Sequence, residues 1–222
     1  ATKVLVQGGR AGATLDAPKG LALVGDTLWV ADITHVRAFN RRTGAPIADI
    51  DLESRKALFL NDIAVGGDGA IYVTDTGILF DTKGALPHAG VGQIFKIAGR
   101  TVTTLRADSL NSPNGIAWDS ASSRFVLGPM NGKAVQTWNE GDKTATTLVN
   151  GPGQYDGVEV LADGRILVTS WADSAVHVIE NGELATLVPH VSAPADIGVD
   201  TKRGIIAIPR LNDNKIDYYK IP

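Results

Sequence analysis

The chain has 222 residues, with 21 Lys and Arg against 24 Asp and Glu, a formal net charge of -3 and no cysteine. Repeat and barrel folds of about this length commonly form one domain, so we expect a single domain over residues 1–222. The charge balance, with no basic run, argues against a nucleic-acid partner. No apolar run approaches the roughly 18 residues that a membrane span needs, and the sequence leaves the compartment and the oligomeric state open.

The chain opens with a lone predicted strand and a connector. Residues 2–7, TKVLVQ, alternate polar and apolar side chains, which predicts a strand that needs a partner elsewhere. The GGRAGA of the connector lacks the Gly-Lys-Ser/Thr ending that grips phosphate, so it does not predict a phosphate site.

Five stretches of the chain then repeat one pattern, in which a polar element leads into an apolar strand, a tight turn and a second apolar strand. Equivalent positions of the repeats lie 42, 53, 42 and 39 residues apart. Those positions are occupied, in chain order, by Lys19, Asn61, Asn114, Asp156 and Ala195. Periods of roughly 40 to 50 residues made only of strands indicate propeller blades.

We therefore predict an all-β propeller of four-stranded antiparallel blades, five of them visible in this chain. The strands of the first repeat are expected at residues 20–24, 27–32, 35–40 and 46–52. Those of the second are expected at 62–65, 70–75, 92–97 and 101–106, with an insertion at 77–91 that we interpret as a mobile flap over the mouth. A β-sandwich is the rival architecture, but sandwich strands do not repeat one loop chemistry at a fixed period.

The remaining strands follow the same order. The third repeat predicts strands at 115–118, 124–127, 134–138 and 145–149, and the fourth at 157–161, 165–170, 175–179 and 184–188. Asn181-Gly182 lies between the last two of these, which is a strong hairpin signal. The fifth repeat predicts only three strands, at 196–199, 204–208 and 215–219.

The three-stranded fifth repeat raises the question of ring closure. An unpaired outer edge invites aggregation, so we expect residues 3–7 to pair beside residues 215–219 and close a five-bladed ring. The alternative is an open six-blade arrangement in which a missing first blade is supplied from outside.

Polar residues at the start of the innermost strands are the candidate site, because these strands line the central channel of a propeller. They are Lys19, Asn61 with Asp62, Asn114, Asp156 and Asp196. The structural alternative is that Asn and Asp at such junctions only cap backbone groups. Carboxylate and amide oxygens suit a hard cation such as Ca²⁺ or Mg²⁺. Such a metal polarises a carbonyl and activates water, which favours lactone or ester hydrolysis.

The motifs LND at 60–62, SPNG at 112–115 and YDG at 155–157 resemble the senescence marker protein, gluconolactonase and luciferin-regenerating-enzyme family over essentially the whole chain. The resemblance implies a six-bladed propeller with a divalent metal held by a Glu, an Asn and an Asp. By motif, it implies Asn114 as a metal ligand, Asp156 as a metal ligand and catalytic base, and Asn61 as a substrate-binding residue. Ca²⁺ is the expected metal, with Mg²⁺, Mn²⁺ or Zn²⁺ as alternatives.

The family's Glu has no counterpart in this chain. In the family it lies at the start of the first blade, and this chain begins at the outer strand of that blade. Asp196 and Asp75 are the best replacements. Lys19, Arg210 and Trp171 are further substrate-binding candidates, although core packing for Trp171 and a solvated surface position for Arg210 are the plainer interpretations.

Two functions of different classes remain open. The first is a metal-dependent hydrolase of a sugar lactone or related cyclic ester, weakened by an incomplete metal site. The second is a non-catalytic propeller that binds a small molecule or a protein partner. A purely structural propeller, engineered or truncated, is a third possibility.

Overall fold

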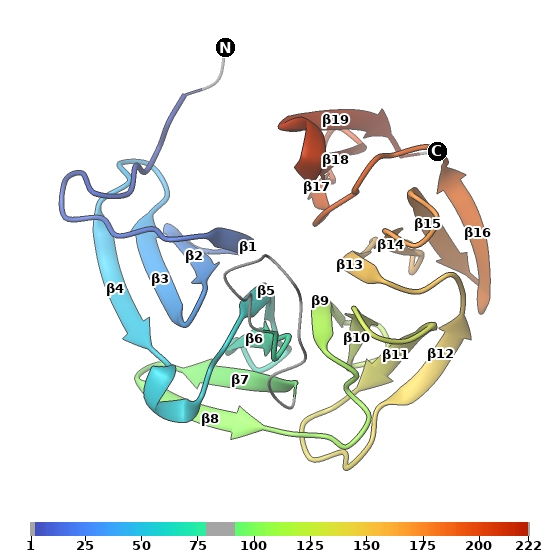
Figure 1. Ribbon diagram of the computed structural model, residues 1–222, viewed down its shortest axis with the longest axis horizontal. Coiled ribbons are helices and arrows are strands. Elements are labelled where there is room, and N and C mark those ends of the chain that lie inside the picture. Colours follow the sequence, from blue (N-terminus) through green and yellow to red (C-terminus); the bar gives the residue numbers. More distant parts are fainter. Residues whose placement is uncertain (1–2, 79–91, 222) are drawn as a thin grey trace.

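Five antiparallel β-sheets follow one another around a centre in the computed structural model of the chain, which describes residues 3–78 and 92–221 (Figure 1). Four of the sheets have four strands, and the fifth has three among the described residues. The predicted all-β propeller is therefore confirmed. The predicted flap at 77–91 falls almost entirely outside the described residues.

The strands occur in sequence order within every blade. The first blade contains β1 (Pro18–Val24), β2 (Thr27–Asp32), β3 (His35–Asn40) and β4 (Pro46–Asp51). The second contains β5 (Leu60–Val65), β6 (Ile71–Asp75), β7 (Gln93–Ala98) and β8 (Thr101–Leu105). The third contains β9 (Pro113–Asp119), β10 (Arg124–Pro129), β11 (Ala134–Trp138) and β12 (Thr146–Asn150). The fourth contains β13 (Tyr155–Val160), β14 (Ile166–Ser170), β15 (Ala175–Glu180) and β16 (Glu183–Val188), and the fifth β17 (Gly198–Asp200), β18 (Ile205–Arg210) and β19 (Lys215–Lys220).

Tight turns join the strands where the sequence supplies residues that accept positive φ. Asn181 and Gly182 connect β15 to β16 with φ of 52° and 80°, as the hairpin signal predicted. Gly69 and Gly164, with φ of 76° and 89°, play this part in the first hairpins of the second and fourth blades. Helix is limited to two short 3₁₀ turns in the described residues, Glu53–Arg55 and Leu211–Asp213.

The hydrophobic core lies between successive blades. Between the first and second blades, Ala31 and Val36 pack with Ile63, Val73 and Phe95. Equivalent clusters fill the next three interfaces. The second, third and fourth blades thus bury one face against the preceding blade and the other against the following one, which fixes the inner strands around the channel.

The predicted ring closure is wrong. In the described residues β19 pairs only with β18, and residues 3–7 form no strand. Val6 and Leu15 instead pack against Val30 and Phe39 of the first blade. The N-terminal segment therefore covers the outer part of the first blade, and the first and fifth blades flank an open side of the ring (Figure 1).

Candidate active site

The inner strands of the blades enclose a cavity of about 460 Å³ along the centre of the molecule. Its walls come from β1, β5, β9 and β13 and from the start of the fifth blade, and the surface exposed to the cavity is mainly polar although many lining residues are apolar. Three carboxyl groups, those of Asp62, Glu159 and Asp196, face this cavity. The channel is therefore an acidic cavity whose volume suits a small ligand.

The candidate residues lie in β-bulges at the start of the inner strands, which we call the mouth of the channel, and none of the four is among the residues that line the cavity itself. The pairing of the inner strand with its neighbour shifts register at this point in each of the first four blades. A bulge leaves residues unpaired and turns their side chains away from the regular pleat. The residues within these irregular stretches include Lys19, Asn61, Asn114 and Asp156.

Asn114 and Asp156 lie together at the mouth. Asn114 is 1% exposed, and its Nδ2 donates to the backbone oxygen of Tyr155 at 3.1 Å. Its Oδ1 is buried without a hydrogen-bond partner among the described residues. Trp171 donates from Nε1 to Oδ2 of Asp156 at 3.0 Å. This pair thus offers an amide oxygen and a carboxylate whose bonding capacity is unfilled.

The environment of Asp156 favours its protonated form. Burial is the main cause and the charge of Asp196 adds to it, and together they raise the pKa of Asp156 to about 7. Hydrogen bonds from Trp171 and Asn114 act in the opposite direction. The carboxyl group therefore changes charge near neutral pH, where a general base is most effective.

The other channel carboxyl groups are perturbed in the same direction. Burial, followed by the charge of Asp196, raises the pKa of Glu159 to about 8. The same two causes hold the pKa of Asp62 well above its usual range, although the backbone N–H groups of Ile116 and Ile63 donate to this carboxylate at 2.8 and 2.7 Å. Burial raises the pKa of Asp196 to about 6. The negative charge of Asp196 thus contributes to the raised pKa of each of the other three carboxyl groups.

Sequence reasoning missed Glu159. Its position in β13 is occupied in the other blades by small residues, namely Ala22, Ala64, Ala117 and Gly198. A long acidic side chain where every other repeat has a small one is a signal that a comparison of the inner strands alone would have found.

The substrate-binding candidates are each held by a neighbour. Asn61 donates from Nδ2 to Oγ1 of Thr76 at 3.1 Å. Lys19 donates from Nζ to the backbone oxygen of Ala17 at 2.7 Å, and Nζ lies 4.3 Å from the centre of the Phe59 ring. Burial lowers the pKa of Lys19 to about 8, although the charge of Asp32 opposes this shift.

Two other candidates serve the local fold. The guanidinium of Arg210 forms ion pairs with Asp213 and Asp217 beyond the end of β18. The Asp75 carboxylate accepts hydrogen bonds from the backbone N–H groups of Leu58, Phe59 and Gly77 and from the Gln93 amide. Four donors fill the lone pairs of one carboxylate, so Asp75 is no replacement for the absent Glu.

Asn114 and Asp156 supply the right kind of ligand for a hard cation, since both present oxygen. Across residues 3–78 and 92–221, no three His, Cys, Asp or Glu side chains are grouped so that they could hold a metal ion. The donor set is thus chemically suitable but short in protein carboxylates. No helix in this part of the chain is long and apolar enough to span a membrane.

Comparison with known proteins places these features in context. A family model, the SMP-30/Gluconolactonase/LRE-like region, matches residues 1–200. No curated protein matches the chain. Similar solved structures include a catalytically inactive virginiamycin B lyase from Staphylococcus aureus with quinupristin, at a TM-score of 0.67 and 15% identity over 91% of this chain. The chain spans 65% of the length of that lyase.

Two further structures are similar over most of the chain. A gluconolactonase from Xanthomonas campestris has a TM-score of 0.67 and 19% identity, over 87% of this chain and 70% of its own. A chain of a nidogen/laminin complex has a TM-score of 0.64 and 17% identity, over 91% of this chain and 80% of its own. At these identities the structures show the propeller fold and nothing about activity.

Proposed function

The chain belongs to the SMP-30/gluconolactonase/LRE-like family, and on that premise we propose that it is a metal-dependent hydrolase of a sugar lactone or related cyclic ester. The observation that carries the proposal is the unpartnered, buried Oδ1 of Asn114 beside the carboxyl group of Asp156. A buried amide oxygen without a partner is costly in a folded protein, and a bound cation would satisfy it.

Asn114 and Asp156 would hold the cation through Oδ1 and a carboxylate oxygen. When bound, the metal supplies a Lewis acid that polarises the carbonyl of the cyclic ester. Ca²⁺ prefers about six to eight oxygen ligands, so this chain's two contribute a minority. The family's Glu has no counterpart among the residues of the mouth, and we therefore expect weak metal affinity.

Asp156 would also act as the general base. Trp171 donates to its Oδ2 and orients the carboxyl group, which would accept a proton from the attacking water. Burial raises the pKa of Asp156 to about 7 without a metal, and a bound cation would lower it, so that Asp156 would be a carboxylate able to accept a proton at neutral pH. Asn61 and Lys19, at the equivalent positions of the first two blades, would bind the hydroxyl and carbonyl oxygens of the substrate.

A non-catalytic binding platform is the second candidate function. It is favoured by the absence of a three-residue metal grouping within the described part of the chain. One structurally similar chain comes from a complex between two proteins, nidogen and laminin, so the fold itself is compatible with such a role.

Asp156→Ala tests the assignment. We expect it to abolish Ca²⁺ binding in calorimetric titration and the hydrolysis of a panel of sugar lactones, followed by acid release. Asp163→Ala is the matched control, because Asp163 is an exposed Asp in the turn between β13 and β14. Full hydrolysis by Asp156→Ala, or no divalent-ion binding by the parent protein at millimolar concentration, favours the binding platform instead.

A further inference from the structure

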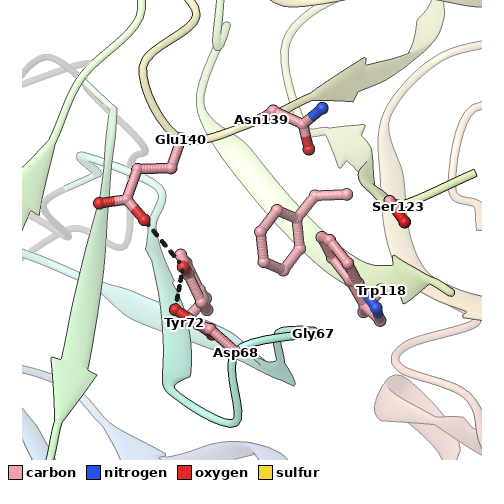
Figure 2. Close-up of a pocket in the computed structure, with 8 residues that line it drawn as sticks. Gly67, Asp68, Tyr72, Trp118, Ser123, Asn139 and Glu140 are labelled. Carbon is pink, nitrogen blue, oxygen red and sulfur yellow. Dashed lines mark hydrogen bonds between the residues drawn. The ribbon is translucent and has the colours of Figure 1, made fainter.

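A second cavity, of about 420 Å³, lies between the second and third blades (Figure 2). It is lined by residues at the ends of β5, β9 and β11, whereas Asn61 and Asn114 lie at the beginnings of β5 and β9. The cavity is therefore separated from the channel mouth by the length of a strand. Lactone hydrolysis at the mouth makes no use of it.

Aromatic rings form the wall of this cavity. The ring centres of Tyr72 and Phe125 are 4.4 Å apart, and those of Trp118 and Phe125 are 4.7 Å apart with the planes at 64°. Figure 2 shows Trp118 and Tyr72 on the cavity wall, with the turn that carries Gly67 beneath them. A side-chain carbon at Gly67 would lie 2.6 Å from the Trp118 indole, so glycine is needed for this approach.

The polar rim of the cavity is rich in acceptors. Asp68 and Glu140 place carboxylate oxygens 3.1 and 3.0 Å from the hydroxyl of Tyr72 (Figure 2). Lys96 is the one cation that these carboxylates pair with in the described residues, with Nζ at 2.8 Å from Asp68 and 2.6 Å from Glu140. Two carboxylates and one ammonium leave a net charge of about -1 on the rim.

Lys96 shows what chemistry the site accepts. Its Nζ lies 5.5 Å from the centre of the Tyr72 ring while it pairs with both carboxylates. An ammonium group beside an aromatic face and between two carboxylates is the arrangement by which proteins recognise organic cations. Tyr72 and Phe125 are only 3% and 2% exposed, so the remaining negative charge and the partly exposed Trp118 indole are what the cavity offers to a second cation.

We propose that this inter-blade cavity binds a small organic cation that carries a quaternary ammonium or alkylguanidinium group. The partly exposed indole of Trp118 presents its negative face to the cation, and Asp68 and Glu140 neutralise the charge of the cation. The cavity volume is within the range of small-molecule sites. Trp118 also lines the channel cavity, so the two cavities share this side chain, whereas Asp68 and Glu140 line only the inter-blade cavity. The proposal goes beyond the proposed hydrolysis.

Choline and its neutral isostere 3,3-dimethylbutan-1-ol test the proposal directly, since they match in shape and differ in charge. In NMR titrations of the full chain, with the indole N–H signals as reporters, we expect choline to bind about tenfold more tightly. Equal affinity for the two compounds, or no saturable binding of choline, overturns the proposal.

Variants separate recognition of charge from a structural role. Glu140→Gln should weaken choline binding, whereas Lys96→Gln should strengthen it several-fold, because removing the internal cation leaves both carboxylates for the ligand. A merely structural ion pair predicts the opposite sign for Lys96→Gln, so an unchanged or weaker affinity there overturns the proposal. Glu183→Gln, at an exposed position on β16, is the matched control, and melting temperatures confirm that each variant is folded.

Discussion

Carboxyl groups packed around one channel keep their protons to a higher pH than exposed ones, because burial disfavours the charged form. Burial is the first cause of the raised pKa at Asp156, Glu159 and Asp196, and the charge of Asp196 is the second at the other two groups. Their pKa values, about 7, 8 and 6, lie above the roughly 4 of an unfolded chain. The folded protein therefore binds more protons than the unfolded one between about pH 4 and 8.

The stability of the protein should consequently fall as pH rises through this window. A raised carboxyl pKa makes the protonated form the favoured one in the folded state, so the contribution is present at low pH and lost above the folded pKa. We expect the melting temperature, measured in chelator, to decrease between pH 5 and 8. Glu159→Gln should flatten that decrease, whereas Asp163→Asn, in an exposed turn, should not; identical slopes for all three proteins would contradict the assignment.

Residue-level prediction from sequence worked where the repeat itself supplied the comparison. Asn114 and Asp156 occupy equivalent positions of adjacent blades, and the structure brings them together. Their roles as ligand and base stay predictions. Asp75 was misjudged because its hydrogen bonds to Leu58 and Phe59 depend on a loop course that no residue pattern specifies.

Neighbouring blades are joined at the mouth by threonine hydroxyls of the second strands. Thr74 Oγ1 accepts from the backbone N–H of Asp62 at 2.9 Å and donates to the backbone oxygen of Asn114 at 2.6 Å. In the fourth blade, Thr169 Oγ1 accepts from the backbone N–H of Gly157 at 2.8 Å and donates to the backbone oxygen of Ala195 at 2.8 Å. Each hydroxyl thus connects the bulged inner strand of its own blade to the mouth of the next.

Replacing such a hydroxyl by a methyl group should loosen both blades. Thr169→Val keeps the shape of the side chain but leaves a buried donor and acceptor unsatisfied, so we expect a loss of about 1–3 kcal/mol in the free energy of unfolding. Urea denaturation measures it. Thr103→Val, at an exposed position on β8, should change stability by about 0.5 kcal/mol or less. Equal effects of the two substitutions would show that the inter-blade bonds contribute nothing.

Strands were the most predictable elements, since alternation and turn residues are local properties of the sequence. The exception is the segment 3–7, which alternates like a strand and yet forms none. An alternating pattern predicts that one side of a segment is apolar, but it does not predict which surface of the protein will cover that side. Val6 packs against the first blade rather than completing the fifth.

At the scale of the whole molecule, the open side of the ring leaves two blade faces without a following or preceding blade. The outer strand β19 carries Lys215, Asp217 and Lys220, and charged side chains are a usual protection of an exposed edge. On the first blade, Leu21 is 56% exposed. Its equivalents Ile63, Ile116, Val158 and Ile197 are 5%, 2%, 2% and 4% exposed because the preceding blade covers each of them.

Truncating the side chain at this one position of the repeat should therefore change the free energy of unfolding by very different amounts in different blades. Ile116→Ala removes a buried side chain from the interface of the second and third blades and should cost about 2–5 kcal/mol. Leu21→Ala, at the same place in the first blade, removes a side chain that already meets solvent and should cost about 0.5 kcal/mol or less. Chemical denaturation of both variants measures the difference. A cost for Leu21→Ala as large as that for Ile116→Ala would mean that the face of the first blade is covered in solution, and that the ring is closed there by another part of a chain.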